Sequence, residues 1–251
     1  MTPFVSIIVP IRNEEKYIRQ CLESLLHQDY PHDMYEILVV DGVSQDASAS
    51  IVDDIATTHG NVRRLHNPKK YVSAGLNVGI RESRGDIVVR MDAHALASRT
   101  YVSKCVKHLL RTGADNVGGI MKPEGRGFWG QSIALATSCP FGVGNSKHRC
   151  SLEEGYDEAG WLGAFWKDTL LELGGYNELL VINEDDELNY RLMKRGGKVY
   201  RTPEIETVYF CRNSLKALAV QYFRYAYWKL PVIRVWSPSR RDQCRWYHGT
   251  H

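Results

Sequence analysis

The stretch VSIIVPIRNEEKYIRQCLESLLHQ, residues 5 to 28, contains two hydrophobic patterns in succession. Residues 5–10 are almost wholly apolar, and the run ends at Pro10. A short apolar run of this kind is typical of a buried strand. From Asn13 onward the apolar residues recur at helical spacing, and Glu14 and Glu15 supply the acidic first turn that helices favour. The stretch therefore predicts a strand followed directly by an amphipathic helix.

The same unit repeats along the first half of the chain. Further strands are predicted at 35–41, 61–67, 86–95 and 115–123, and further helices at 44–60, 72–85 and 98–114. Nearly all-apolar strands that alternate with helices are typical of a parallel sheet with helices on both faces. Such sheets bind ligands beyond the carboxyl ends of their strands. We therefore expect the functional residues at that edge.

The pattern changes after Pro123. Residues 124–150 are rich in glycine and aromatic residues and show no clear period. The remaining segments predict a helix at 181–197, a strand pair or hairpin at 198–211, and a final amphipathic helix at 214–229. The sequence shows no internal repeat and no sharp domain boundary.

Composition narrows the classes of function. Lys and Arg number 32 against 29 Asp and Glu, and the resulting charge of +3 predicts no nucleic-acid partner. Basic residues concentrate after Arg212, where Asp242 is the only acid, so this tail can face phosphates or anionic lipids. The six cysteines form no Cys-x-x-Cys pair, no signal peptide is recognisable, and no apolar run reaches the about 18 residues that span a bilayer. These features predict a cytoplasmic protein.

Asp92 and His94 follow the apolar run 87–89 at a predicted strand end. Residues two apart in a strand point to the same side, so both side chains can reach one cation. A divalent ion that bridges two phosphates takes oxygen ligands and can take one imidazole. The alternative interpretation makes Asp92 a cap of the following turn and His94 a surface residue.

Four consecutive acids, Glu184 to Glu187, begin the helix predicted near residue 184. The helix dipole favours acids in a first turn, and a solvated helix start explains part of the run. Four acids in a row exceed what capping requires, and they repel one another. One of them could act as a general base toward a hydroxyl group.

Weaker signals come from one acid and two aromatic residues. Asp41 directly follows the second predicted strand, where a carboxylate can accept a hydrogen bond from a nucleotide base, while Ser44 or Asp46 can cap the next helix. Trp161 or Trp166 could stack on a sugar, although most aromatic residues of that segment are expected in the core. No Gly-x-Gly-x-x-Gly follows the first strand, which argues against a dinucleotide-dependent dehydrogenase.

Together, five segments resemble the family 2 glycosyltransferases, which have the GT-A fold. In order they are VSIIVPIRNEEKYIRQCLESLLHQDYP, EILVVDGVSQDAS, LNVGIRESRGDIVVRMDAHA, GAFWKDTLLELGGYNE and NEDDELNYRLMKRGGKV. The segments RMDAHA, FGVGNSKHR and QYFRYAYWK further resemble the succinoglycan-type (ExoA-like) bacterial exopolysaccharide glycosyltransferases.

The resemblance implies an α/β architecture with a Rossmann-like, mostly parallel sheet flanked by helices and a C-terminal amphipathic helix. It implies a GT-A catalytic domain over 1–213, with a nucleotide-binding half at about 1–122 and an acceptor-binding half at about 123–213. Residues 214–251 form the amphipathic helix and basic tail.

The resemblance also assigns roles to individual residues. Four residues match positions that hold the uridine of the donor, namely Pro10, Arg12, Glu14 and Asp41. Asn77 and Arg84 lie in the segment that lines the nucleotide pocket. Asp92 matches the acid that reaches the metal and the diphosphate. Asp185 matches the catalytic base, with Glu184 beside it and Asp186 as the second choice. Gln221 and Arg224 loosely match the Gln-x-x-Arg-Trp motif of processive synthases, with Tyr225 in place of Trp.

Two departures from the family pattern concern the cation. Gly42 stands where a second acid usually follows Asp41, and His94 replaces the last acid of Asp-x-Asp. Either Mn²⁺ or Mg²⁺ is implied as cofactor, and His94 predicts that Mn²⁺ supports activity at least as well as Mg²⁺. The implied reaction is transfer of a hexose from a UDP-sugar with inversion, Arg212 assisting departure of UDP.

The implied acceptor is a glycan or a polyprenol-linked sugar in polysaccharide synthesis. The apolar stripe of the last helix either covers the catalytic domain or contacts the inner face of the cell membrane as a peripheral anchor. Two rival functions are a sugar-phosphate nucleotidyltransferase, whose glycine-rich loop is missing after the first strand, and a non-catalytic binder of nucleotide sugars.

Overall fold

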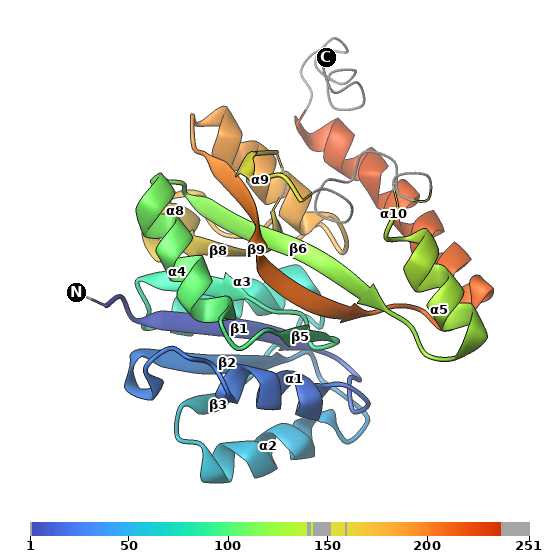
Figure 1. The fold of residues 1–251 in the computed structure, drawn as a ribbon, viewed down its shortest axis with the longest axis horizontal. Helices are drawn as coiled ribbons and strands as arrows, with labels where there is room; N and C mark the ends of the chain where they lie inside the picture. Colours follow the sequence, from blue (N-terminus) through green and yellow to red (C-terminus); the bar gives the residue numbers. More distant parts are fainter. Residues whose placement is uncertain (1, 140–141, 143–151, 159, 237–251) are drawn as a thin grey trace.

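The computed structural model of the chain describes residues 2–139, 142, 152–158 and 160–236 (Figure 1). The sheet has nine strands in the order β3-β2-β1-β4-β8-β6-β9-β5, and β7 pairs with β9 outside this path. The strands are β1 Val5–Ile11, β2 Tyr35–Asp41, β3 Val62–His66, β4 Ile87–Arg90, β5 Ala95–Ala97, β6 Asn116–Glu124, β7 Gly155–Tyr156, β8 Trp161–Trp166 and β9 Val199–Phe210. The helices are α1 Ile18–Leu26, α2 Ser48–Thr58, α3 Val72–Glu82, α4 Tyr101–Thr112, α5 Gly127–Ala136, α8 Lys167–Glu172, α9 Glu184–Lys194 and α10 Leu215–Trp236, with a short 3₁₀ turn at His32–Met34.

Strands β1 to β4 form the parallel part of the sheet. Val5, Ile7 and Val9 of β1 face a core shared with α1, α2 and α4, whereas Ile8 faces a second core shared with α3, α8 and α9. In Figure 1, α1 and α4 lie in front of the sheet and α3 lies behind it. Both faces are therefore buried at β1, β2 and β4, which explains why nearly every position of these three strands is apolar, whereas the edge strand β3 is mostly polar. The predicted α/β fold with helices on both faces is confirmed.

Beyond β4 the sheet becomes mixed. Strand β8 lies antiparallel between β4 and β6, β9 runs parallel to β6, and β5 and β7 lie antiparallel to β9. Strand β5 begins directly after the turn that contains Asp92 and His94, and the backbone N–H of Phe210 donates to the carbonyl of His94 (3.1 Å). The end of β9 is thus attached to this turn, and α10 follows from there.

The prediction of a strand pair or hairpin at 198–211 was wrong, because β9 is a single strand of 12 residues. Its register against β6 shifts between Gly118, which pairs with Arg201, and Ile120, which pairs with Glu206. The extra residues of β9 include Pro203, which cannot donate to a ladder and is accommodated at such an irregularity. The proline marked a bulge, where the sequence pattern had suggested a turn.

Several boundaries also differ from those predicted. Strand β1 continues through Pro10 to Ile11, Asn13 then adopts a left-handed conformation (φ 58°), and α1 begins only at Ile18. Strand β4 ends at Arg90, so Asp92 and His94 lie in the following turn instead of in the strand.

Helix α5 lies in the segment for which no period was recognised. Three of its large apolar side chains, Phe128, Trp129 and Leu135, are exposed, while its buried residues are Gly130, Ile133 and Ala134. Apolar residues therefore lie on both sides of the helix, which conceals the 3.6-residue pattern.

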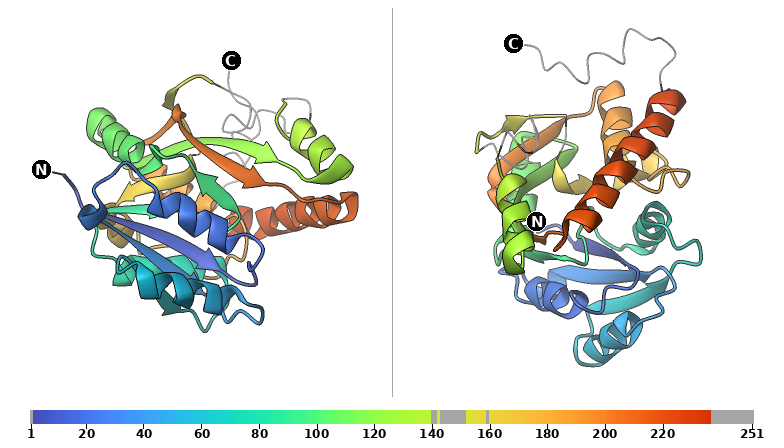
Figure 2. Two further views of the ribbon diagram at one scale, coloured as in Figure 1. Left: turned by 60° about the horizontal axis from the view of Figure 1, so that its bottom comes forward. Right: turned by 90° about the vertical axis from the view of Figure 1, so that its right-hand side faces the viewer.

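The final helix was predicted from Ser214, and α10 begins one residue later. The Ser214 hydroxyl accepts a hydrogen bond from the N–H of Ala217 (3.2 Å), as an N-cap does. Figure 2 shows α10 as the long red helix beside α9. None of the helices in the described part of the chain combines the length and apolar character needed to cross a membrane. The basic tail predicted after α10 lies outside the described residues.

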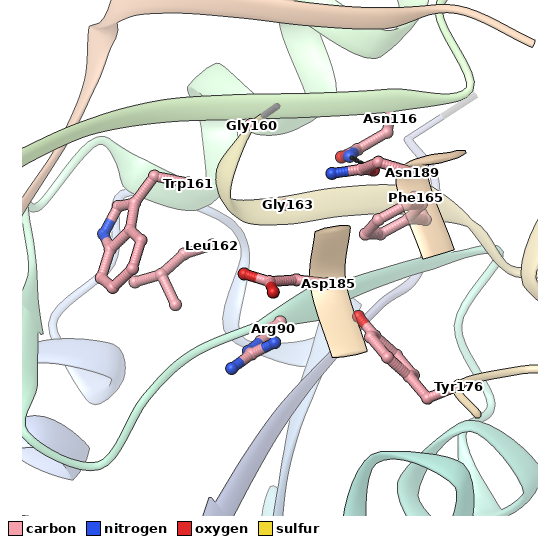
Figure 3. A pocket seen from close by; sticks show the side chains of 10 residues that line it. All are labelled: Arg90, Asn116, Gly160, Trp161, Leu162, Gly163, Phe165, Tyr176, Asp185 and Asn189. Carbon is pink, nitrogen blue, oxygen red and sulfur yellow. Dashed lines mark hydrogen bonds between the residues drawn. The ribbon is translucent and has the colours of Figure 1, made fainter. Parts of the chain in front are cut away.

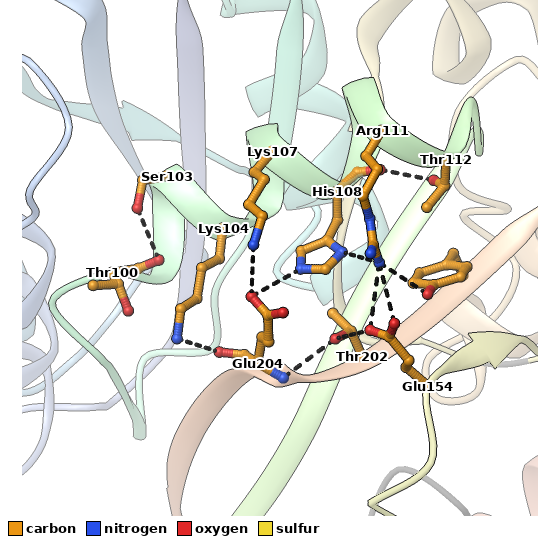
Figure 4. A network of polar contacts seen from close by, with 11 residues as sticks. Thr100, Ser103, Lys104, Lys107, His108, Arg111, Thr112, Glu154, Thr202 and Glu204 are labelled. Atoms are coloured by element: carbon orange, nitrogen blue, oxygen red, sulfur yellow. Dashed lines mark hydrogen bonds and ion pairs between the residues drawn. The ribbon is translucent and has the colours of Figure 1, made fainter.

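A network of polar contacts attaches α4 to β9 (Figure 4). The fully buried His108 accepts a hydrogen bond at Nδ1 from Arg111 (3.0 Å), and its Nε2 lies 3.3 Å from Glu204 Oε2. The ring is therefore neutral with its proton on Nε2. Burial lowers the pKa of His108, and Arg111 and Lys107 lower it further against the opposing effect of Glu204. The ring also stacks on Tyr200.

This network predicts a loss of stability on acidification. An unfolded histidine gains a proton as the pH falls through about 6.5, while folded His108 resists protonation, so the free energy of unfolding falls by at most about 1.4 kcal/mol per pH unit below that value. His108→Gln should reduce this slope in urea unfolding measured between pH 7.5 and 5. His27→Gln, which changes an exposed histidine, is the control. Identical slopes for the wild type and His108→Gln would contradict the prediction.

Candidate active site

A cleft of about 970 Å³ opens at the carboxyl end of β4. Its lining comes from the turn after β4, the start of β8, the loop before α9 with the first turn of that helix, and the chain from the end of β9 along α10, with Val72 of α3 beside them. Helices α9 and α10 lie side by side (Figure 2, right), and the Asn183 amide donates to the carbonyl of Tyr225 (3.3 Å). The predicted edge of the sheet is therefore the place where polar side chains converge.

The turn after β4 supplies Asp92 and His94 to one wall. The Asp92 carboxylate accepts a hydrogen bond from Arg90 Nε (3.2 Å), and both side chains are largely buried. The His94 ring packs edge-on against Tyr209, and its Nδ1 lies 3.5 Å from Glu14 Oε1. The two predicted metal ligands thus line one cleft, although they do so from a turn and not from the strand on which the spacing argument relied.

These residues fit an open cation site. Within the described ranges, no three His, Cys, Asp or Glu side chains converge closely enough to hold a metal by themselves. Divalent ions that act on phosphates are typically held by one or two protein ligands, while substrate phosphates and water complete the coordination shell. Asp92 and His94 match that arrangement, since both reach the cleft where a substrate can enter.

A second part of the lining begins with Asn183, whose left-handed conformation (φ 64°) turns the chain into α9. Asparagine tolerates this conformation better than most residues. The turn brings Glu184, Asp185 and Asp186 to the cleft in the first turn of α9, where the helix dipole stabilises their charges.

Cations neutralise three of the four consecutive acids. The ion pairs are Glu184 with Arg90 (2.9 Å), Asp186 with Lys229, and Glu187 with Arg191 (2.7 Å). Burial raises the pKa of Glu184 to about 7 in spite of Arg90, and burial also raises the pKa of Asp186.

Asp185 differs from its neighbours. Within the part of the chain that the structure describes, its carboxylate forms no ion pair and accepts only the backbone N–H of Asp186 (2.9 Å). Figure 3 shows its side chain between Arg90 and Leu162, pointing into a small cavity of about 10 Å³ that adjoins the cleft. Asp185 lines both spaces, so this carboxylate is the one of the run that can accept a proton without first losing an ion pair.

The predicted uridine residues lie at the carboxyl ends of β1 and β2. Asp41 is buried, accepts the N–H of Ser44 (3.0 Å) and lies 4.0 Å from Arg64. A Cβ at Gly42 would lie 3.1 to 3.2 Å from the carbonyl oxygens of Lys70 and Ile11, so a larger residue there would be tightly packed. The neighbouring candidates at the end of β1 are Pro10, Arg12 and Glu14, of which Arg12 is exposed.

The structure does not bring two predicted residues to this edge. The Asn77 amide is buried and donates to the Tyr176 carbonyl (2.8 Å) and to Glu178 (3.0 Å), so it connects α3 to the loop after α8. Arg84 lies at the opposite, amino-terminal edge of the sheet, where it pairs with Glu36 (3.0 Å) and packs over Phe4. Both assignments to the nucleotide pocket are therefore corrected.

Other predicted residues do line the cleft. Trp161 lies in its wall, where its indole N–H donates to Thr207 (2.9 Å), whereas Trp166 packs against the core. Gln221 and Arg224 face the cleft from α10, and Gln221 donates to the Tyr225 hydroxyl (2.7 Å).

Three basic residues that line the cleft, Arg90, Lys216 and Lys229, were not predicted as site residues. Arg90 is the last residue of an otherwise apolar strand, and that position was an available signal. Lys229 is one of several basic residues on α10, and nothing in the sequence distinguished it.

Comparison with known proteins agrees with this geometry. A family model described as "Glycosyl transferase family 2" matches residues 6–150. The succinoglycan biosynthesis protein ExoA of Rhizobium meliloti is 33% identical over 221 residues, which are 87% of this chain and 67% of that protein. A dolichyl N-acetyl-alpha-D-glucosaminyl phosphate 3-beta-D-2,3-diacetamido-2,3-dideoxy-beta-D-glucuronosyltransferase of Methanococcus voltae is 28% identical over 92% of this chain and 74% of its own length.

Solved structures give the same result for the fold. The mannosyltransferase PcManGT of Pyrobaculum calidifontis, in complex with GDP-Man and Mn²⁺, superposes with a TM-score of 0.63 at 27% identity. TarS of S. aureus superposes with a TM-score of 0.65 at 19% identity. Both alignments cover 83% of this chain, which spans 57% of the first solved chain and 60% of the second. The chain belongs to glycosyltransferase family 2.

Proposed function

We propose that the protein transfers a hexose from a UDP-sugar to a hydroxyl of a glycan or lipid-linked acceptor, with inversion at the anomeric carbon. One observation carries the proposal: Asp92, in the turn after β4, and Asp185, at the start of α9, line the same cleft, and Asp185 forms no ion pair among the described residues. A cation-binding acid and an available proton acceptor can thereby act on the same sugar.

The donor end of the site lies at β1, β2 and the turn after β4. Pro10, Arg12, Glu14 and Asp41 hold the uridine in this proposal, and Asp92 and His94 hold the divalent cation. The cation, when bound, neutralises charge that develops on the departing diphosphate. TarS has been solved with UDP and with UDP-GlcNAc, and PcManGT with GDP-Man and Mn²⁺, which supports a nucleotide-sugar donor here.

The transfer itself is a single displacement. Asp185 accepts the proton of the acceptor hydroxyl, whose oxygen attacks the anomeric carbon from the face opposite the diphosphate. The bond between that carbon and the diphosphate oxygen breaks, and UDP leaves with the electron pair. Arg212, which lines the cleft, lies where it can stabilise the negative charge. The proposed step forms no covalent bond to the enzyme.

The acceptor end comprises Trp161 and the wall of α10 that contains Gln221 and Arg224. In this proposal residues 1–122 bind mainly the nucleotide, 123–213 mainly the acceptor, and 214–251 complete the acceptor side. A relative whose name specifies a dolichyl-phosphate-linked substrate supports a lipid-linked acceptor, and ExoA supports a role in exopolysaccharide synthesis.

The proposal is tested by following UDP release from a UDP-hexose with and without a polyprenol-linked acceptor. A thermal-shift screen of nucleotide sugars with Mn²⁺ selects the donor, because a ligand of the folded form raises the apparent stability. We expect acceptor-dependent UDP release, and Mn²⁺ should support it at least as well as Mg²⁺ because His94 is a ligand. Binding of UDP-hexose without any release would favour a non-catalytic nucleotide-sugar binder, and a clear preference for Mg²⁺ would remove His94 from the cation site.

Peripheral membrane contact on the cytoplasmic face is a further part of the proposal. Phe223 and Tyr227 of α10 are exposed by 71% and 58%. Lys216 and Arg224 on the same helix suit anionic headgroups.

Phe223→Glu together with Tyr227→Glu should lower the fraction that floats with anionic vesicles by about tenfold or more, since one buried aromatic side chain contributes about 1.5–3 kcal/mol. The control is Leu179→Glu, which changes a side chain exposed by 79% outside α10. Unchanged flotation of the double variant would exclude α10 as the anchor.

A further inference from the structure

Arg90 joins the two walls of the cleft. It is the last residue of β4, and its side chain is only 13% exposed. Its Nε donates to Asp92 Oδ1 (3.2 Å), while its Nη1 lies 2.9 Å from Glu184 Oε1. One guanidinium therefore bridges the carboxylate at the donor end and the residue next to the base.

The bridge connects segments that are distant in the sequence. Asp92 lies in the turn after β4, and Glu184 is the first residue of α9. Glu184 is buried, and burial raises its pKa, so it requires a charged partner to stay ionised. Figure 3 shows Arg90 and Asp185 at the same small cavity, one reaching it from the sheet and the other from the helix.

We propose that Arg90 is a positioning residue, which holds the Asp92 carboxylate and the start of α9 at a fixed separation and thereby sets the distance between the cation site and Asp185. The inference rests on the proposed function of this cleft. A misplacement of about 1 Å can cost about 10²-fold in rate, so a link of this kind acts on turnover more than on donor binding.

The chemistry of the bridge requires arginine. The planar guanidinium offers donors in several directions. In Arg90 the Nε donates to Asp92, and Nη1 lies at ion-pair distance (2.9 Å) from Glu184 without the geometry of a hydrogen bond. Lysine carries the same charge on a single ammonium group. Arg90→Lys therefore keeps the positive charge between Asp92 and Glu184 but loses the planar group that contacts both carboxylates.

The same helix supplies a matched control. Arg191 is 14% exposed, binds Glu187 (2.7 Å), and donates to the carbonyls of Leu173 and Gly175. It is not among the residues that line the cleft. Arg191→Lys therefore removes a similarly buried guanidinium from α9 and leaves the contacts of Arg90 with Asp92 and Glu184 unchanged.

The experiment compares both variants with the wild type by Tm, by kcat and donor KM for transfer, and by the Mn²⁺ dependence of the thermal shift produced by UDP. We expect similar, small losses of Tm for the two variants. Arg90→Lys should lower kcat about tenfold or more and weaken Mn²⁺ binding about tenfold, because partners that orient a metal ligand typically contribute 10- to 100-fold. Its donor KM at saturating Mn²⁺ should change less than about threefold, and Arg191→Lys should leave kcat and Mn²⁺ binding within about twofold.

Equal effects of the two variants on kcat and Mn²⁺ binding would overturn the inference and leave the proposed function standing. If Arg90→Lys does not fold, Arg90→Gln combined with Glu184→Gln removes the charges of both partners and is compared in the same way, with loss of Mn²⁺ binding expected. A wild-type protein that neither transfers sugar nor binds UDP with Mn²⁺ would overturn the proposed function, and the inference with it.

Discussion

Asp185→Asn should lower sugar transfer by about 10²-fold or more while UDP binding stays within about twofold of the wild type, because a positioned general base contributes about 10²–10⁴-fold. Asparagine keeps the shape of the side chain and its hydrogen bond from the N–H of Asp186, but it cannot take the proton of the acceptor. The measurements are kcat for acceptor-dependent UDP release and the thermal shift produced by UDP with Mn²⁺.

The adjacent residue provides the control. Asp186 also lines the cleft, but its carboxylate is paired with Lys229. We expect Asp186→Asn to retain most of the transfer activity. Near-normal turnover by Asp185→Asn combined with a large loss in Asp186→Asn would move the role of base to Asp186.

Asp92→Asn should abolish a different property. Asp92 lines the cleft and is the acid that we propose to hold the cation. Its loss should remove the Mn²⁺ dependence of UDP binding and lower transfer by about 10²–10³-fold, the size of effect seen when one stabilising group for developing charge is removed. Titration calorimetry of UDP with and without Mn²⁺ measures the first effect, and kcat measures the second.

Asp33→Asn changes an exposed acid away from the cleft and should match the wild type in both assays. Retained Mn²⁺-dependent binding of UDP by Asp92→Asn would exclude Asp92 as a ligand. Asp185→Asn is expected to keep Mn²⁺-dependent binding of UDP. The two variants therefore distinguish the proposed role of Asp92 in cation binding from the proposed role of Asp185 as the base.

The sequence was most informative where burial on both faces imposed an unbroken apolar run. Ile37, Val39 and Val40 of β2 are fully or almost fully buried, so the strand could be recognised without knowledge of its neighbours. The mixed half was harder to predict, because β9 contains Pro203 and charged residues that only its register shift against β6 accommodates.

Candidate site residues were recognised from the chemistry of their side chains and not from their being close together in the sequence. Acids and imidazoles at element ends suit phosphate and proton chemistry, which made Asp92, His94 and one of the acids 184–187 candidates, and the family resemblance then singled out Asp185; Asp92, His94 and Asp185 all line the cleft. Arg84 was misplaced because α3, with its 11 residues, extends about 16 Å and carries the chain to the far edge of the sheet. The bridge made by Arg90 depends on a contact between β4 and α9, which residue spacing alone does not indicate.

A crystal structure of the protein with UDP and Mn²⁺, with the metal located by its anomalous scattering, would show whether one cleft holds the cation, the diphosphate and the base. We expect an anomalous peak bound by the Asp92 carboxylate and the diphosphate of UDP, with Asp185 facing that diphosphate across the same cleft. A metal and UDP bound at a place that shares no cavity with Asp185 would refute the proposed mechanism.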